Sequence, residues 1–307
     1  MLIEIDSLLN DCITNFNLYI LNEENYVLFR SSNLPFTEKH KQNLLSKKLK
    51  IYINASDYQK YLEYIKNNIS NLKNNNDLSI EIKNKYFYES SKIVINNIFE
   101  SPDNTDLKNN VQILAETAVD LLKDNDYNLQ NILKVIQFEY STLTHSLNVS
   151  LIISNFAKLA GYDEKNIPLL IKGALLHDIG KSRIDKAVLL KPGKLDKHEW
   201  DEMKKHPLYG VNIVKSHEVK EKIILDCIMY HHEKFDGSGY PFNLPYSEIP
   251  LEAQLVAVCD VFDALTTRRC YKNALGSFPA FRIMLNEMEG SFNKDLLHIF
   301  INMFKTE

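Results

Sequence analysis

The sequence predicts an all-helical domain preceded by a small α+β domain. Over the first 75 or so residues, apolar and polar side chains alternate as they do in strands. From about Leu78 onward apolar residues recur at helical spacing, and no strand-like alternation occurs. A third observation, the concentration of histidine and aspartate in the second half, predicts that the chemistry lies in the helical domain.

The N-terminal segment 1–75 is expected to form three strands and a helix. Residues 16–36 (FNLYILNEENYVLFRSSNLPF) alternate around a turn at Asn22–Asn25, which predicts a β-hairpin. Lys48–Ser56 (KLKIYINAS) is typical of a third strand. Asp57 is expected to cap a helix whose buried face carries Tyr58, Tyr61, Leu62 and Ile65. We interpret this domain as regulatory.

The domain boundary is predicted at Asn67–Asp77, which is rich in Asn and Lys and has little periodicity. A helical connector is expected at 76–125 and a catalytic domain at 126–307. The helices are expected near 79–99, 106–123, 128–138, 142–160, 167–177, 197–204, 208–216, 218–231, 250–266, 278–289 and 293–304.

Bulk properties exclude several classes of protein. The net charge of −4 over 307 residues gives no basic field for long nucleic acid. No uncharged apolar run reaches the roughly 18 residues that span a bilayer, and the acidic start MLIEIDSLLND lacks the basic region of a signal peptide. The four cysteines form no CxxC pair and are interpreted as reduced thiols. We expect a cytoplasmic protein.

A histidine and an aspartate stand side by side in HDIGK, at His177 and Asp178. They follow the apolar run IPLLIKGALL, so both should emerge near the C-terminal end of a helix. Neighbouring helical residues differ by about 100° in direction, so the two side chains can approach metals from different sides. A carboxylate can bridge two ions, whereas an imidazole cannot.

Five further side chains complete a candidate ligand set: His145, His206, His231, His232 and Asp260. His206 is expected at the end of a helix. Asp260 lies on a strongly apolar helix, where a carboxylate is costly unless it is paired or metal-bound. Five histidines and two aspartates exceed the needs of one tetrahedral ion and suit two ions that share Asp178. Nitrogen and oxygen ligands without thiolate fit iron, manganese or zinc, and a two-metal site is typical of phosphoester hydrolysis.

Four runs together resemble the HD-GYP family, a branch of the HD phosphohydrolase superfamily that hydrolyses cyclic di-GMP: HDIGK, KPGKLDKHEWDEMKKHPLYG, HHEKFDGSGYP and LVAVCDVFDALTTRRCYKNA. The resemblance extends from about Gln130 to the C-terminus. It implies an HD-type helical fold and cleavage of cyclic di-GMP, by a hydroxide that bridges two metals, to pGpG and, after a second cut, to GMP. It assigns His145, His177, Asp178 and Asp260 to one metal, and Asp178, His206, His231 and His232 to the other.

The number of metals depends on one position. Three-metal members of the family carry a glutamate four residues before the histidine that matches His145, and here that position is Ser141. A hydroxyl is a weak substitute for a carboxylate, so we expect two divalent ions, iron or manganese, with zinc as an alternative.

Basic residues near the motifs are candidates for binding phosphate. Lys181 could neutralise a phosphate oxygen or protonate the leaving group; the alternative is a surface lysine. Arg269 and Lys272 match positions where the family carries basic residues for the phosphates of its ligand, and an arginine can bind them in bidentate fashion.

The GSGYP segment should form a turn close to the metals. Gly237 and Gly239 allow positive φ, and Pro241 fixes the exit. Tyr240 could stack on a guanine, bond to a phosphate or simply pack in the loop. The resemblance implies that this loop also contacts partner proteins, including diguanylate cyclases.

Three nearby residues are expected to have supporting roles. Asp236 and Asp263 are candidates for orienting ligand histidines or Arg269. Trp200 is interpreted as a packing residue.

Two alternatives to cyclic di-GMP hydrolysis stay open. One is hydrolysis of another cyclic dinucleotide such as cGAMP, or of a different phosphoester. The other is a weakly active receptor for cyclic dinucleotides that acts through protein contacts. Tight binding with negligible turnover would indicate the receptor.

Overall fold

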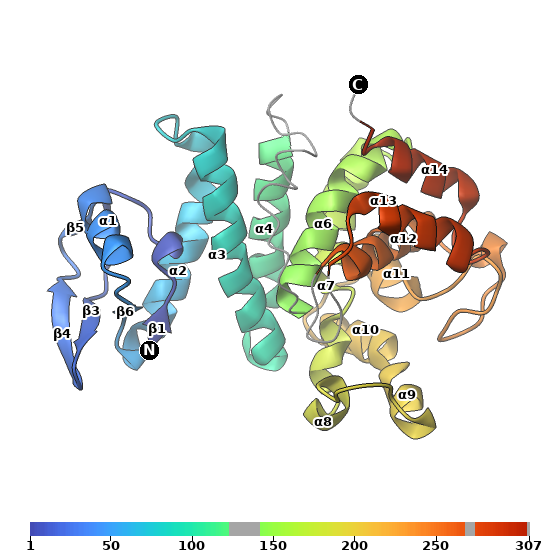
Figure 1. Ribbon diagram of the computed structural model, residues 1–307, viewed down its shortest axis with the longest axis horizontal. Coiled ribbons are helices and arrows are strands. Elements are labelled where there is room, and N and C mark those ends of the chain that lie inside the picture. Colours follow the sequence, from blue (N-terminus) through green and yellow to red (C-terminus); the bar gives the residue numbers. More distant parts are fainter. Residues whose placement is uncertain (123–141, 268–273, 306–307) are drawn as a thin grey trace. The chain divides into compact units, whose positions relative to one another are not determined.

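A computed structural model describes residues 1–122, 142–267 and 274–305 of the chain (Figure 1). Two compact units are present, Met1–Val94 and Ile95–Glu307. They therefore divide within helix α3 (Ile80–Glu100) and not at the Asn-rich segment that composition indicated. That segment is partly helical, since α2 continues to Asn71 and Ile69 and Leu72 are buried.

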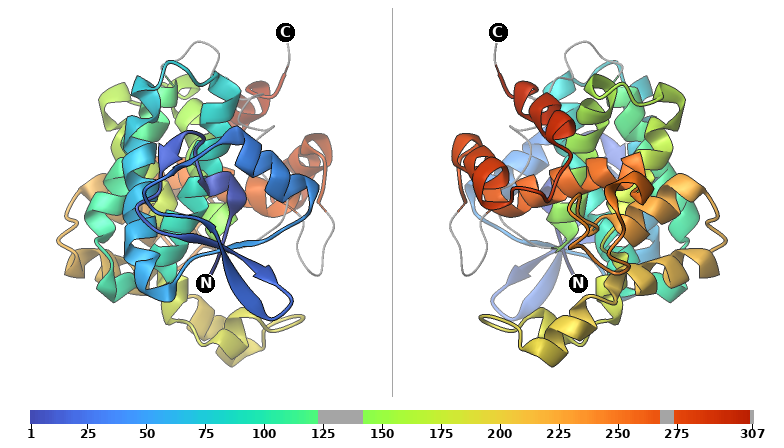
Figure 2. Two further views of the ribbon diagram at one scale, coloured as in Figure 1. Left: turned by 90° about the vertical axis from the view of Figure 1, so that its left-hand side faces the viewer. Right: turned by 90° about the vertical axis from the view of Figure 1, so that its right-hand side faces the viewer.

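The N-terminal unit contains the small antiparallel sheet that the alternation predicted. Its strands lie in the order β1 (Leu2–Ile3), β6 (Ile51–Tyr52), β3 (Leu18–Asn22) and β4 (Asn25–Arg30). Strands β3 and β4 form the predicted hairpin, with Asn22 opposite Asn25, and the hairpin extends downward in dark blue in the left view of Figure 2. The two short strands β2 (Cys12–Ile13) and β5 (Pro35–Phe36) pair separately.

Helices α1 (Glu38–Ser46) and α2 (Tyr58–Asn71) belong to the same unit as the sheet. Tyr61, Leu62 and Ile65 of α2 are buried, as their spacing predicted. Asp57 occupies the N-cap position of α2, but its carboxylate makes no capping bond and instead pairs with Lys60 at 2.7 Å.

Helices are the only regular secondary structure among the described residues of the second unit. Its helices are the end of α3, α4 (Leu107–Leu122), α6 (Thr142–Leu159), α7 (Ile167–Leu176), α8 (Lys186–Leu189), α9 (Lys197–Met203), α10 (His206–Ser216), α11 (Lys222–Tyr230), α12 (Leu251–Thr266), α13 (Ser277–Arg282) and α14 (Lys294–Asn302). Most of these bounds agree with the predicted segments to within a few residues. The predicted helix at 128–138 lies outside the described residues.

Helix α6 is the centre of this unit. It packs against α7 and α12 (Figure 1), and its side chains from Thr144 to Ser154 are all buried. Helix α7 approaches α11 closely at Gly173, where a Cβ atom would lie 2.6 Å from Cys227 Sγ. A glycine is required there because a larger residue would push the two helices apart.

Two local features differ from the prediction. His206 begins α10 instead of ending α9, because Pro207 occupies the first turn, where its missing N–H costs no hydrogen bond. The short helix α8 was not predicted, since four residues are too few to show helical periodicity. Among the described residues, no helix is both long and apolar enough to cross a membrane.

Candidate metal centre

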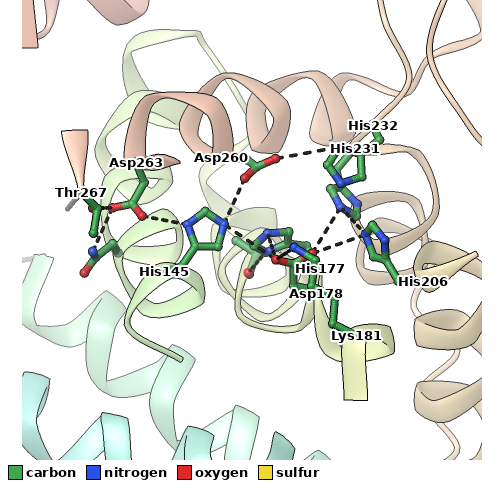
Figure 3. Close-up of polar contacts among 12 residues, drawn as sticks. His145, His177, Asp178, Lys181, His206, His231, His232, Asp260, Asp263 and Thr267 are labelled. Atoms are coloured by element: carbon green, nitrogen blue, oxygen red, sulfur yellow. Dashed lines mark hydrogen bonds and ion pairs between the residues drawn. The ribbon is translucent and has the colours of Figure 1, made fainter. Parts of the chain in front are cut away.

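The seven predicted ligand side chains come together in the second unit, although they come from five different parts of the chain. His145 lies on α6 and Asp260 on α12, while His177 and His231 follow the last residues of α7 and α11 (Figure 3). Their atoms form two groups that could each hold an ion. One group is His145, His177 and Asp178, and the other is Asp178, His206, His231 and His232.

Asp178 is common to both groups and directs one carboxylate oxygen toward each. Its Oδ2 lies 3.5 Å from His177 Nε2 and 3.8 Å from His145 Nε2. Its Oδ1 lies 3.4 Å from His206 Nε2 and 3.9 Å from His231 Nε2. This geometry is suited to a carboxylate that bridges two ions.

Asp260 closes the opposite side of the cluster. Its Oδ1 lies 3.0 Å from His145 Nε2, and its Oδ2 lies 4.0 Å from His232 Nδ1. The carboxylate therefore contacts a member of each group, as Figure 3 shows.

Four of the five histidines are held through Nδ1, which leaves Nε2 directed into the cluster. His177 Nδ1–H donates to Ala174 O at 2.7 Å and His206 Nδ1–H to Met203 O at 2.9 Å. His231 Nδ1–H donates to Ile228 O at 2.9 Å. A backbone carbonyl can only accept, so these bonds fix the tautomer whose Nε2 lone pair is available to a metal.

The fourth histidine, His145, donates Nδ1–H to a carboxylate instead. Its partner is Asp263 Oδ2 at 2.7 Å. The other oxygen of Asp263 accepts from Asn148 Nδ2 at 2.8 Å and from Thr267 Oγ1 at 3.1 Å. Asp263 is thus the buried group that orients His145, and Asn148 and Thr267, which the motifs did not single out, hold it in place.

Burial keeps the imidazoles in the form that binds metal. It lowers the pKa of His206 to about 4 and the pKa of His232 to about 3, and it also lowers the pKa of His177 and His231. These rings are therefore neutral at pH 7, and a neutral imidazole offers a lone pair.

The two aspartates are ionised despite their burial. Burial raises the pKa of Asp178, but opposing charges, of which the ammonium of Lys181 is the largest, hold the pKa well below its usual range. Burial likewise raises the pKa of Asp260, and the hydrogen bond and charge of His145 more than reverse the shift.

The polar atoms at the centre have the arrangement expected of a metal site. Within the described part of the chain, His177 Nε2 and Asp178 Oδ1 are buried without a hydrogen-bond partner. A buried acceptor of this kind costs about 1–3 kcal/mol unless it is satisfied. Because one atom belongs to each group, two cations would satisfy both, and the ligands present fit a pair of divalent ions.

Lys181 lies at the edge of the cluster, in the 3₁₀ turn Ile179–Arg183. Its Nζ donates to Asp178 Oδ2 at 2.5 Å, and its side chain is 18% exposed. Lys181 is therefore paired with a candidate ligand and only partly exposed. The turn itself packs tightly on α10, since a Cβ atom at Gly180 would lie 1.9 Å from His206 O.

Tyr240 lies directly beside the cluster. Its ring stacks on His232 with centroids 4.6 Å apart, and its backbone N–H donates to His232 O at 3.1 Å. Gly237 has the predicted positive φ of 76°. Gly239 is needed for a different reason from the one predicted: a Cβ atom there would lie 2.3 Å from Lys234 N.

Glu233 is a buried residue that the motif analysis overlooked. Its Oε1 accepts from Phe242 N–H at 2.7 Å and its Oε2 from Leu244 N–H at 3.0 Å. It holds the loop that carries Tyr240 against the end of α11. The signal in the sequence was an acidic residue directly after the candidate ligands His231 and His232. A buried carboxylate is rare unless hydrogen-bond partners satisfy it.

Of the remaining predicted site residues, the structure describes only Asp236. Asp236 is exposed and accepts from Ser238 N–H at 2.9 Å, so the structure gives it no contact with a ligand histidine. Arg269, Lys272 and Ser141 lie outside the described residues.

Residues 142–265 match the family described as HD domain. Over 161 residues the chain is 39% identical to the 3'3'-cGAMP-specific phosphodiesterase 2 of Vibrio cholerae. The matched region covers 52% of this chain and 30% of that protein. Over 205 residues the chain is 32% identical to the cyclic di-GMP phosphodiesterase of Thermotoga maritima, with 65% and 56% covered. The chain thus spans between about a third and about half of the length of these curated relatives.

A solved structure shares the fold over the whole length. The protein Bd1817 of Bdellovibrio bacteriovorus, described as an HDG"Y"P protein, superposes with a TM-score of 0.72 at 22% identity and covers 100% of this chain and 99% of that one. At this identity the likeness shows the fold alone. The family match and these relatives confirm the resemblance to HD-type phosphohydrolases that the motifs indicated.

Proposed function

We propose, from the match of residues 142–265 to the HD domain family, that the protein is a metal-dependent phosphodiesterase that hydrolyses cyclic di-GMP to pGpG. The observation that carries the proposal is the bridging arrangement of Asp178, whose two oxygens face separate groups of imidazoles. Relatives that are named as cyclic di-GMP and cGAMP phosphodiesterases support the substrate class.

Two divalent ions would be held by the residues that the sequence assigned. His145, His177, Asp178 and Asp260 would bind one ion, and Asp178, His206, His231 and His232 the other. The ligand set of imidazole and carboxylate favours iron or manganese and also accepts zinc. Bound there, such a pair supplies Lewis acidity to the phosphate oxygens and acidifies a water.

Lys181 is the residue best placed to act on the substrate itself. Its ammonium lies against Asp178 and remains partly open to solvent. From there it can donate to a non-bridging phosphate oxygen or protonate the departing 3′ oxygen. Arg269 and Lys272 are proposed to hold the remaining phosphate oxygens, in the role that the family resemblance gives them.

The test is chromatography of cyclic di-GMP incubated with protein that has been loaded with Fe(II) or Mn(II). We expect pGpG to form, with GMP after longer incubation, and Asp178→Asn to reduce the rate at least about 10³-fold. Asp295→Asn, an exposed aspartate on α14, is the matched control and should keep full activity. Absence of turnover by metal-loaded protein would refute the proposal.

The same assay separates the two alternatives. Parallel incubations with cGAMP compare the two cyclic dinucleotides, because the 39% identical relative is named as specific for cGAMP. Faster turnover of cGAMP would reassign the substrate within the same reaction class. Tight binding of cyclic di-GMP without turnover would instead identify a receptor that acts through protein contacts, with the GYP loop as the proposed contact surface.

A further inference from the structure

Trp200 is the one tryptophan of the chain and lies on α9 (Lys197–Met203), in the second unit. The residue is 45% exposed, so the interpretation of Trp200 as a packing residue is not supported. Tryptophan is the largest apolar side chain, and leaving nearly half of it in water forgoes a substantial part of its burial energy. An exposed position for it therefore needs an explanation.

The helix that carries Trp200 is anchored on both sides of it. Glu199 accepts from Lys191 Nζ at 2.7 Å and 2.5 Å and closes a capping box with Asp196. Glu202 accepts from Tyr209 Oη at 2.9 Å, which ties α9 to α10. Residues on both sides of Trp200 are thus held, which anchors the helix that carries the indole.

Trp200 is the last of three aromatic rings in contact, of which the first, His232, belongs to the metal cluster. The ring of Tyr240 stacks on His232 with an interplanar angle of 29°. Trp200 meets Tyr240 at a centroid distance of 5.9 Å and an angle of 79°. The two rings therefore form a corner, with Tyr240 next to the candidate ligands and the more exposed indole one ring further out.

The geometry points to a purine-binding subsite in which a base of the substrate stacks on Trp200, with Tyr240 forming the second wall of the corner. The inference rests on the proposed function, since it takes the phosphorus to lie at the metal cluster. One ribose separates a base from its phosphate. With the phosphate at the metal cluster, the base would therefore lie beyond the candidate ligands and near Trp200. Stacking on an indole tolerates any base, so this subsite would accept guanine and adenine alike.

Fluorescence offers a direct test because Trp200 is the sole tryptophan. Metal-loaded protein is titrated with the phosphorothioate analogue of cyclic di-GMP, which resists hydrolysis. We expect saturable quenching of the tryptophan emission and no quenching by ribose 5-phosphate at the same concentrations. Binding of the analogue, measured by calorimetry, without any change in emission would overturn the inference, as would no binding at all.

Kinetics provide the second readout. Trp200→Ala should raise KM for cyclic di-GMP and for cGAMP by about 10-fold, whereas kcat should stay within about twofold. Trp200→Phe should keep most of the affinity because it retains a stacking face. Phe278→Ala removes a 78% exposed aromatic from α13 and is the matched control that should change neither constant.

A small diester without a nucleobase separates this inference from the proposed function. Trp200→Ala should hydrolyse methyl p-nitrophenyl phosphate at the wild-type rate. If the wild type cleaves cyclic di-GMP and Trp200→Ala does so with unchanged KM, the subsite is refuted and the proposed function stands. If the analogue quenches the emission but no cyclic dinucleotide is cleaved, the subsite stands and the proposed function fails.

Discussion

Asp178 is the residue on which the two candidate ion positions depend. Each of its oxygens faces a different pair of imidazoles, at 3.4–3.9 Å. Among the described lysines and arginines, only Lys181 forms an ion pair with Asp178. That ion pair helps to keep the Asp178 carboxylate ionised. A buried carboxylate with one partly exposed ammonium is costly to maintain, which is consistent with a group kept for binding metal.

We expect Asp263 to influence the metal affinity through its hydrogen bond to His145. Asp263→Asn weakens the bond that fixes the His145 tautomer, and loss of such an outer partner typically costs about 10–100-fold in metal affinity. Competition with a chelator measures this change. Asp236→Asn, at an exposed position just before the GSGYP segment, is the matched control and should bind metal as the wild type does. Equal affinities in the two variants would contradict this role for Asp263.

Residue identities along the chain were enough to pick out the seven side chains that converge. They could not assign roles to Glu233 or Asn148, because both act through partners that only the fold brings near. Glu233 bonds to backbone groups nine and eleven residues away, and Asn148 to an aspartate 115 residues away.

At the scale of elements, the 3₁₀ turn after α7 and the start of α10 act as one unit. Gly180 places the turn against His206 O and Gly210 N, so the packing that orients Asp178 also orients His206. Two candidate ligands thus depend on a single backbone contact.

Gly180→Ala should therefore disrupt both the fold and the site. The added Cβ would lie 1.9 Å from a backbone oxygen, which cannot move as a side chain could, and we expect a loss of at least about 3 kcal/mol in the free energy of unfolding. Gly276→Ala, where the nearest atom would be 3.7 Å away, should change stability by less than about 1 kcal/mol. Urea unfolding measures both, and similar losses would contradict the argument.

Helical periodicity located most helices because each has one buried face. It failed where the signal was local or absent. Helix α8 is too short to show a period, and α10 begins at His206 because Pro207 favours a first turn. The boundary between the compact units lies within the continuous helix α3, so the composition change at Asn67–Asp77 did not mark it.

On the scale of the whole molecule, the buried histidines couple folding to pH. Their pKa values are lowered in the folded protein, to about 4 for His206 and about 3 for His232. Below the unfolded value of about 6.5 the unfolded chain takes up protons that the folded chain does not. Stability therefore falls as the pH drops from about 6.5 toward 4.

Chelator-treated protein should consequently unfold more easily at pH 5 than at pH 7. Each such histidine contributes up to about 2 kcal/mol to the difference, and calorimetry at several pH values measures it. His206→Gln should reduce the slope, whereas His298→Gln, on the exposed face of α14, should not. A flat profile between pH 7 and pH 5 would contradict the burial of neutral imidazoles.

The central claim is that seven side chains hold two ions that share Asp178. Anomalous diffraction from crystals of metal-loaded protein, together with metal analysis of the same sample, tests it most directly. We predict two full ions per chain about 3.5–4 Å apart, one on each side of the Asp178 carboxylate. A single ion, a third full ion, or ions bound away from Asp178 would contradict the account.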